Sequence, residues 1–315
     1  MLKFDKITIL CYNSAVIKGE LVMDNAAEKY IIESFLDYKE RREDGTLYNE
    51  FDNTPQRLIL FYYLNNDEVD FGHIVSNFKE KFVFNENELE SVKTAEERDG
   101  VGVVYDYIRD KGYENFPSIY IILKLHSLLY SKCPYPEFGG KFRSADACIS
   151  NSDVKTTAPG EISKEIAALN TEYLDLLKFG DMIKEEKRPD QLIEYINRCL
   201  DLKCRLVEIH PFPDGNGRTT RALVNMLFRK VDLPIVYVQK KEKDEYIKAM
   251  DRAIRLKDKS SIRKFYYYKI CDSIIELDMD ERVKQLAEER ETETNDLPKT
   301  LTLVRPISKA YQRKQ

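Results

Sequence analysis

The sequence predicts a mainly α-helical protein, and three observations lead to that prediction. Apolar residues recur at helical spacing in one segment after another, as they do in amphipathic helices. Proline and glycine fall between these segments, where helices start and stop. One run of small and polar residues, 145–159, interrupts the helical pattern and is the candidate β-hairpin. Short apolar groups before residue 25 are either short strands or an irregular start.

Composition narrows the class of protein. The chain has 315 residues, of which 43% are hydrophobic and 33% are charged, and this fits a soluble globular protein. A net charge of −5 argues against nucleic acid as the main partner, because phosphate backbones need a basic face. The N-terminus lacks the apolar run of a signal peptide, no apolar stretch is long enough to cross a membrane, and the six cysteines form no C-x-x-C pair. We therefore expect a cytoplasmic protein with reduced thiols and no membrane partner.

Residues 1–84 are expected to form a small, mostly helical N-terminal region. Helical spacing begins at Ala26 and should end before Asp44, which a glycine follows. A second helix should start at Thr54, because threonine can cap a helix and the proline that follows it fits the first helical position. A third is expected over 69–82. None of these segments is rich in Arg and Lys, so no DNA-recognition helix is expected.

Helices should make up most of the remaining chain. The expected helices run over 117–131, 161–183, 189–208, 218–231, 246–256 and 261–277. The last segment, 280–315, is a charged tail, dense in Glu, Arg and Lys and without a sustained apolar face. This tail is either one exposed helix or partly disordered.

One stretch, Glu208–Arg221, concentrates the chemistry of a phosphate site. His210 is the candidate general base, because an imidazole exchanges a proton near neutral pH. Pro211 and Pro213 end any helix that arrives from upstream, so His210 should lie at a helix end. Phe212, between the two prolines, is expected to anchor the turn in the core.

The second half of the same stretch offers ligands for a phosphate chain. Asp214 is a hard oxygen ligand of the kind that Mg²⁺ accepts. Gly215-Asn216-Gly217 opens the next helix, and successive backbone N–H groups there form an anion cradle. Arg218 and Arg221 lie on neighbouring sides of the first turn of that helix, and each guanidinium can hold phosphate oxygens through two hydrogen bonds. Each residue alone has an ordinary structural explanation, but the ordered combination indicates a phosphate site.

The stretch resembles the signature of the Fic family, H-x-F-x-(D/E)-G-N-G-R-x-x-R. Every fixed position is matched, by His210, Phe212, Asp214, Gly215, Asn216, Gly217, Arg218 and Arg221. The resemblance implies transfer of AMP from the co-substrate ATP to a hydroxyl side chain of a protein. In such an enzyme His210 deprotonates the hydroxyl, and Asp214 holds Mg²⁺ against the α- and β-phosphates. The N–H groups of Gly215 to Gly217 bind the phosphates, and the two arginines neutralise their β/γ end, with Arg221 on the γ-phosphate.

The resemblance also implies a fold. It predicts a Fic-type helical bundle with its core at 99–279 and a β-hairpin flap at 145–159. A Gly-x-x-Arg step ending at Arg143 resembles the one that precedes the flap in the family. There the flap binds the target protein as an added strand and borders the nucleotide, which implies a nucleotide contact for Ile149.

Two further residues have both a functional and a structural explanation. Tyr246 resembles an aromatic that Fic proteins place beside the adenine, but it would serve equally as a tyrosine packed at a helix start. His126 belongs to a Leu-His-x-x-Leu step that recurs in Fic cores. We expect His126 to be a packed core histidine with hydrogen-bond partners.

Residues 85–98 resemble the inhibitory helix of many Fic proteins, (S/T)-x-x-x-E-(G/N), whose Glu pairs with the second signature arginine. The favoured alignment makes Glu90 the inhibitory residue, paired with Arg221. Two positions depart from the pattern, since Glu86 stands where Ser or Thr is expected and Ser91 where Gly or Asn is expected. A second register gives the role to Glu86, and the sequence leaves open whether either carboxylate inhibits.

Other uses of the same site stay open. Closely similar Fic signatures serve the removal of AMP and the transfer of UMP, phosphocholine or phosphate. A non-catalytic nucleotide sensor is an alternative from another class, although a sensor would not need a base at His210. The expected partners are a protein substrate on the flap, the chain itself through auto-modification, and a second copy in a homo-oligomer. The sequence does not name the target.

Overall fold

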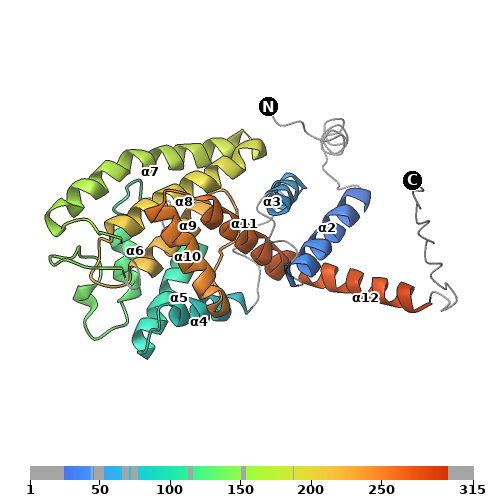
Figure 1. Cartoon of the computed structure of the whole chain (residues 1–315), viewed down its shortest axis with the longest axis horizontal. Coiled ribbons are helices and arrows are strands. Elements are labelled where there is room, and N and C mark those ends of the chain that lie inside the picture. The colour runs from blue at the N-terminus through green and yellow to red at the C-terminus, as the bar shows by residue number, and fades with distance from the viewer. Residues whose placement is uncertain are drawn as a thin grey trace, which may run out of the picture.

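The computed structural model describes residues 25–43, 45, 53–65, 71, 77–112, 116–149, 154–186 and 188–296. Within these ranges the chain is mainly helical, as predicted (Figure 1). The short strands considered before residue 25 lie outside the described residues, as does 297–315. No helix of the described ranges is long and apolar enough to cross a membrane.

The helices follow one another with short connections. They are α2 (Asn25–Glu43), α3 (Thr54–Asn65), α4 (Phe78–Leu89), α5 (Ala95–Arg109), α6 (Ile121–Leu129), α7 (Ile162–Glu185), α8 (Leu192–Ile209), α9 (Asn216–Lys230), α10 (Lys243–Arg255), α11 (Ser260–Ile274) and α12 (Asp280–Asp296). Four single 3₁₀ turns, η1 (Pro136–Phe138), η2 (Pro159–Glu161), η3 (Pro189–Gln191) and η4 (Lys240–Glu242), lie between them, and a π-helical segment, η5 (Ile275–Met279), joins α11 to α12.

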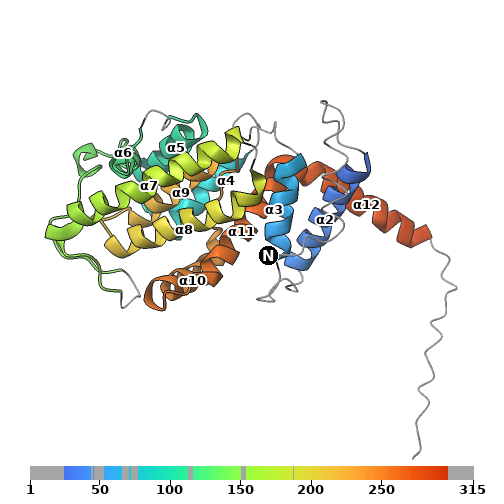
Figure 2. The same ribbon diagram turned by 90° about the horizontal axis from the view of Figure 1, so that it is seen from above.

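Helix α9 is the centre of the core, and α5, α6, α7 and α8 all pack against it (Figure 2). The residues expected to face inward, such as Leu223 and Leu227, are fully buried. Val224 and Phe228, on other sides of the helix, are fully buried as well. A helix that buries apolar residues all round needs neighbours on every side, and this packing fixes the N-terminus of α9, where the signature begins.

Helices α4 and α5 form a helical hairpin against α9. The expected third helix should have ended at residue 82, but α4 runs on to Leu89, and residues 72–76 lie outside the described ranges. The segment 85–98 is therefore the end of α4, a turn, and the first turn of α5. Thr94 caps α5, since its hydroxyl accepts a hydrogen bond from the Glu97 N–H at 3.4 Å.

Helices α2 and α3 pack at the far end of α11, away from α9 (Figure 1). Their boundaries agree with the predicted ones, because α2 ends at Glu43 and α3 begins at Thr54. Helix α12 follows α11 through η5 and packs along α2. Val283 is fully buried there, so the start of the charged tail is a helix that packs against the N-terminal region.

Candidate active site

The loop between α8 and α9 carries the signature, and its backbone is held from within. His210 ends α8 in the left-handed conformation, with φ +52°, and Gly215 precedes α9 with φ +73°. The side chain of Asn216 pins the loop: its Oδ1 accepts the Phe212 N–H at 2.9 Å and its Nδ2 donates to the Phe212 carbonyl at 2.7 Å. Phe212 is buried, as expected for an anchor. Asn216 thus serves the shape of the loop with its side chain, and only its backbone N–H is left for the cradle.

His126 supports the loop from α6. Its Nδ1 accepts the Gly140 N–H at 2.8 Å, so the proton must lie on Nε2, which donates to the Asp214 carbonyl at 3.0 Å. Its ring stacks on Phe212, with the ring centroids 3.9 Å apart. Burial lowers the pKa of His126 to about 4, so the ring stays neutral at pH 7. The prediction of a packed, hydrogen-bonded core histidine is confirmed.

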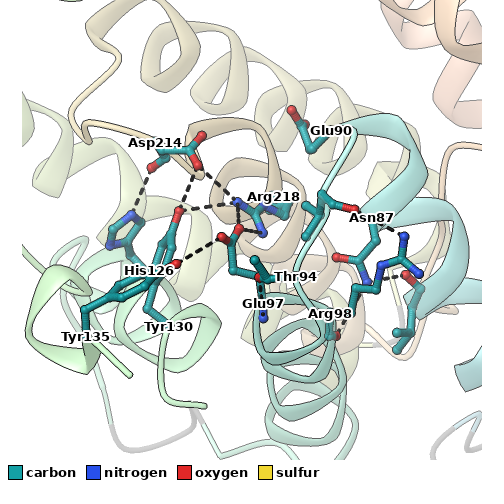
Figure 3. A network of polar contacts seen from close by, with 12 residues as sticks. Asn87, Glu90, Thr94, Glu97, Arg98, His126, Tyr130, Tyr135, Asp214 and Arg218 are labelled. Atoms are coloured by element: carbon teal, nitrogen blue, oxygen red, sulfur yellow. Dashed lines mark hydrogen bonds and ion pairs between the residues drawn. The ribbon is translucent and has the colours of Figure 1, made fainter. Parts of the chain in front are cut away.

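The Asp214 carboxylate is held on one side and open on the other. Its Oδ2 accepts the Tyr130 hydroxyl at 3.1 Å and lies 3.5 Å from Nη2 of Arg218, while the side chain is 68% exposed (Figure 3). No group of three or more His, Cys, Asp or Glu residues that could enclose a metal occurs in the described ranges. A lone, oriented and accessible carboxylate fits Mg²⁺, which takes few protein ligands and fills its other positions with water and phosphate.

Arg221 is buried and meets two carboxylates from the end of α4. Its Nε donates to Glu86 Oε2 at 2.7 Å, and its Nη2 lies 2.8 Å from Glu90 Oε1. A methyl group placed on Gly217 would lie 2.2 Å from the same Glu90 oxygen, so the Glu90 carboxylate covers the glycine of the cradle. An anion therefore already occupies the N-terminus of α9.

The charges of these groups respond to one another. Burial raises the pKa of Glu86 although the Arg221 charge opposes it. For Glu90, burial also acts upward, but the charges of Arg221 and Arg218 outweigh it and the pKa is lowered. Burial alone would lower the pKa of Arg221, yet the two carboxylates raise it well above its ordinary value. Arg221 is thus a fixed cation.

Arg218 is also buried, and α5 supplies its counter-charge. Its Nη1 and Nη2 donate to Glu97 Oε2 at 3.3 and 3.4 Å, and Nη2 also donates to the Tyr130 hydroxyl at 3.3 Å (Figure 3). The α4–α5 hairpin therefore places a carboxylate on each of the two arginines at the start of α9.

A comparison with known families identifies this arrangement. The model of the Fic/DOC family matches residues 116–228, which include α6, the flap segment and the whole signature loop. The chain belongs to the Fic/DOC family.

Relatives and solved structures agree with the Fic assignment. The chain is 25% identical to the protein adenylyltransferase Fic of Nematostella vectensis over 49% of this chain and 33% of that protein, and 27% identical to that of Drosophila grimshawi over 46% and 26%. It thus spans a third or less of these relatives. A Fic-domain-containing signaling protein from Bacteroides thetaiotaomicron matches with a TM-score of 0.50 at 17% identity over 63% of this chain and 85% of that one. Fic-1 from C. elegans matches with a TM-score of 0.50 at 17% identity over 80% and 72%, and both structures show the fold alone.

The candidate base of this Fic domain is kept unprotonated. Burial, followed by the charge of Arg143, lowers the pKa of His210, whereas the Val207 carbonyl, Glu90 and Asp214 oppose the shift. The charges of Glu90 and Asp214 act on the imidazole, which places it within electrostatic range of the cradle and of the carboxylate expected to hold the metal.

Arg143 clamps the Fic loop to the flap, a role that the sequence did not indicate. Its Nε donates to the His210 carbonyl at 2.7 Å, and its backbone N–H donates to Pro211 at 2.9 Å. The same guanidinium donates to the carbonyls of Ala145 and Thr157, one on each arm of the flap. A buried arginine that saturates four segments in this way fixes the flap relative to the base.

The predicted β-hairpin of the Fic flap is present only in part. The described flap residues form one antiparallel bridge, between Cys148 and Lys155, and no longer strand. Residues 150–153 lie outside the described ranges. Ile149 is half-buried and is the last described residue before them, so its predicted nucleotide contact stays a prediction.

The remaining expectations concern Tyr246 and the inhibitory register. Tyr246 is 7% exposed, its hydroxyl accepts a hydrogen bond from buried Lys203 at 2.8 Å, and its ring centroid lies 5.9 Å from the Arg221 guanidinium. This is the packed alternative, at the edge of the site. Ser91 has φ +56°, a conformation that Gly and Asn tolerate best, so the register with Glu90 fits the backbone.

Sequence reasoning missed Tyr130 and Glu97 as site residues. Tyr130 ends a leucine-rich helix, where a tyrosine indicates core packing, and nothing in the pattern pointed to Asp214. For Glu97 a signal existed, because a Thr followed three residues later by Glu marks a helix start and so fixes the side of α5 on which Glu97 lies.

Proposed function

We propose that this chain transfers AMP from ATP to a hydroxyl side chain of a protein. The observation that carries the proposal is the anion already bound over Gly217: a carboxylate rests on the N-terminus of α9, where a phosphate would bind, within range of an imidazole kept neutral. The curated relatives bear the name protein adenylyltransferase, which supports the same reaction.

The residues divide the work of this reaction as follows. Asp214 would hold Mg²⁺, which supplies positive charge against the phosphates when it is bound. The N–H groups of Gly215 to Gly217 bind the phosphate chain, and Arg218 and Arg221 neutralise its outer end. His210 accepts the proton of the incoming hydroxyl.

Bonds and protons balance in a single displacement. The target's hydroxyl oxygen forms a bond to the α-phosphorus as the bond from that phosphorus to the pyrophosphate oxygen breaks. The hydroxyl proton passes to His210, and pyrophosphate leaves with the bonding electrons. Because burial lowers the pKa of His210, the imidazole is ready to accept this proton at neutral pH.

We further propose that Glu90 restrains the enzyme. The Glu90 carboxylate occupies both the cradle and Nη2 of Arg221, so ATP must displace it before its phosphates can bind. The target protein is proposed to dock on the flap, 145–159, as an added strand. Auto-modification, a homo-oligomer and a cytoplasmic location belong to the same proposal.

The test compares labelled donors on the variant Glu90→Gly. Radiolabel from ATP, UTP and CDP-choline is followed onto the protein itself and onto proteins of a lysate. The proposal expects label from ATP, and its loss in the double variant Glu90→Gly, His210→Ala. Label from UTP or CDP-choline alone would replace AMP transfer by another reaction at the same site. Tight ATP binding with no His210-dependent transfer would favour the nucleotide sensor.

A further inference from the structure

The two carboxylates that meet Arg221 approach different edges of its guanidinium. Glu86 Oε2 accepts a hydrogen bond from Nε at 2.7 Å, whereas Glu90 Oε1 lies 2.8 Å from Nη2. The two residues are four apart at the end of α4, so both lie on the face that meets α9. Their different edges give them different relations to the cradle.

The Glu86 pair is sealed from water and the Glu90 pair is not. The side chains of Glu86 and Arg221 are 3% and 4% exposed, while that of Glu90 is 34% exposed. Separation of a buried ion pair leaves two uncompensated charges and costs much more than separation of a solvated one. Glu90 can therefore leave Arg221 while Glu86 stays.

The cradle lies on the Nη side of Arg221. A methyl group at Gly217 would lie 2.2 Å from Glu90 Oε1 and 3.0 Å from Arg221 Nη1, so both groups border the glycine. The Nε edge is turned to Glu86. A phosphate that enters the cradle must take the place of Glu90, but it does not need the place of Glu86.

We infer that Glu86 is a positioning residue, which holds Arg221 through Nε so that both Nη atoms face the cradle, and which keeps this contact after Glu90 has left. Glu86 is thus no second inhibitor. With Nε bound, the guanidinium keeps its Nη donors for a phosphate, and it cannot rotate away from it. The inference rests on the proposed function for the identity of that phosphate, the terminal one of ATP.

Two substitutions separate the reach of Glu86 from its charge. Glu86→Asp keeps the charge but shortens the side chain by one methylene, which takes the carboxylate away from Nε. Glu86→Gln keeps the length and an oxygen acceptor but removes the charge. Both are made in the Glu90→Gly background, so that only the Glu86 contact is tested.

The first measurement needs no nucleotide. The Nε–H signal of Arg221 is followed by ¹⁵N–¹H NMR and is assigned by its loss in Arg221→Lys. We expect a signal protected from exchange in Glu90→Gly and in its Glu86→Gln derivative, and its loss in the Glu86→Asp derivative. A signal that survives in the Glu86→Asp derivative, or that disappears in Glu90→Gly alone, would overturn the inference.

The second measurement compares ATP and ADP, which differ by the terminal phosphate, by calorimetry with Mg²⁺. We expect Glu86→Asp to lower the ratio of ATP to ADP affinity about tenfold, the worth of one charge-assisted hydrogen bond. Glu86→Gln should keep the ratio and tighten both nucleotides, because it removes a negative charge. A competitor of the phosphate would behave in the opposite way: Glu86→Gln would raise the ratio, and Glu86→Asp would leave it unchanged.

The two measurements also separate the inference from the proposed function. If no variant binds ATP, the proposed function fails, and the NMR signal still decides whether Glu86 holds Arg221. If Glu86→Asp does not fold, the ratio in Glu86→Gln still decides between positioning and competition, because the two predict different values for it.

Discussion

Removal of the Glu90 carboxylate should open the cradle to ATP, and the structure gives the size of the effect. Glu90 Oε1 lies 2.8 Å from Nη2 of Arg221, a distance at which an interaction between charged groups contributes about 1.5–3 kcal/mol. The Glu90 side chain is 34% exposed, so solvent screening favours the lower end of that range. About 1.5 kcal/mol is about tenfold in an equilibrium constant, and the apparent affinity for ATP is reduced by the fraction of open sites. Glu90→Gly should therefore bind ATP about tenfold more tightly.

Calorimetry with Mg²⁺ and ATP on the purified chain measures this change. Glu96→Gly is the matched control, because Glu96 is exposed, lies in the first turn of α5, and in the described ranges pairs with neither signature arginine. It removes the same charge from the same hairpin and also places a glycine near a helix end. Glu96→Gly should bind ATP as the unchanged chain does.

Two results would refute this reasoning. Equal ATP affinity in Glu90→Gly and in the unchanged chain would mean that the carboxylate does not hold the cradle closed. An equal gain in Glu90→Gly and Glu96→Gly would mean that general charge, and not the contact with Arg221, governs ATP binding.

Three further predictions concern the groups around the loop. Tyr130→Phe removes the hydroxyl that orients Asp214, so the affinity for Mn²⁺ with bound ADP should fall about tenfold in an EPR titration, and an unchanged affinity would contradict this. Because burial lowers the pKa of His210 below 6.5, the acid limb of the pH–rate profile for AMP transfer should have its midpoint below pH 6.5. The pKa of His126 is lowered from 6.5 to about 4, so its neutral form stabilises the fold above pH 6.5 and this contribution is lost as the pH falls towards 4. Urea unfolding should show a loss of up to about 3 kcal/mol over that range, with a shallower fall in His126→Gln.

Elements with local signals could be predicted from the sequence. Helix α3 begins at Thr54, where the cap and the proline stand next to each other, and the determinants of such a start lie within a few residues. Helix α6 was expected from residue 117 but begins at Ile121. The Ile119 N–H donates to Asn170 Oδ1 at 2.9 Å, so a contact with α7 shapes the turn before the helix. A partner 51 residues away leaves no trace in the local pattern.

The candidate site divides in the same way. The signature residues lie together in the chain, so their spacing alone predicted one phosphate site. Glu86 belongs to a charged segment that indicates a solvated surface, and helical spacing shows only that it shares a face with Glu90. Which face meets Arg221 depends on how α4 packs against α9, and that is a property of the whole fold. Arg143 likewise acquires its role only when the flap and the end of α8 come together.

The acidic hairpin is required by the fold as well as by regulation. The guanidinium groups of Arg218 and Arg221 are 3% and 4% exposed, and a buried charge without a counter-charge costs several kcal/mol. Glu97 supplies the counter-charge for Arg218, and Glu86 and Glu90 supply it for Arg221. The carboxylates therefore take the place of phosphates while the protein folds without a nucleotide. Because these contacts stabilise the chain, activation cannot proceed by removal of all of them. It must proceed through the one carboxylate that water reaches, which is Glu90.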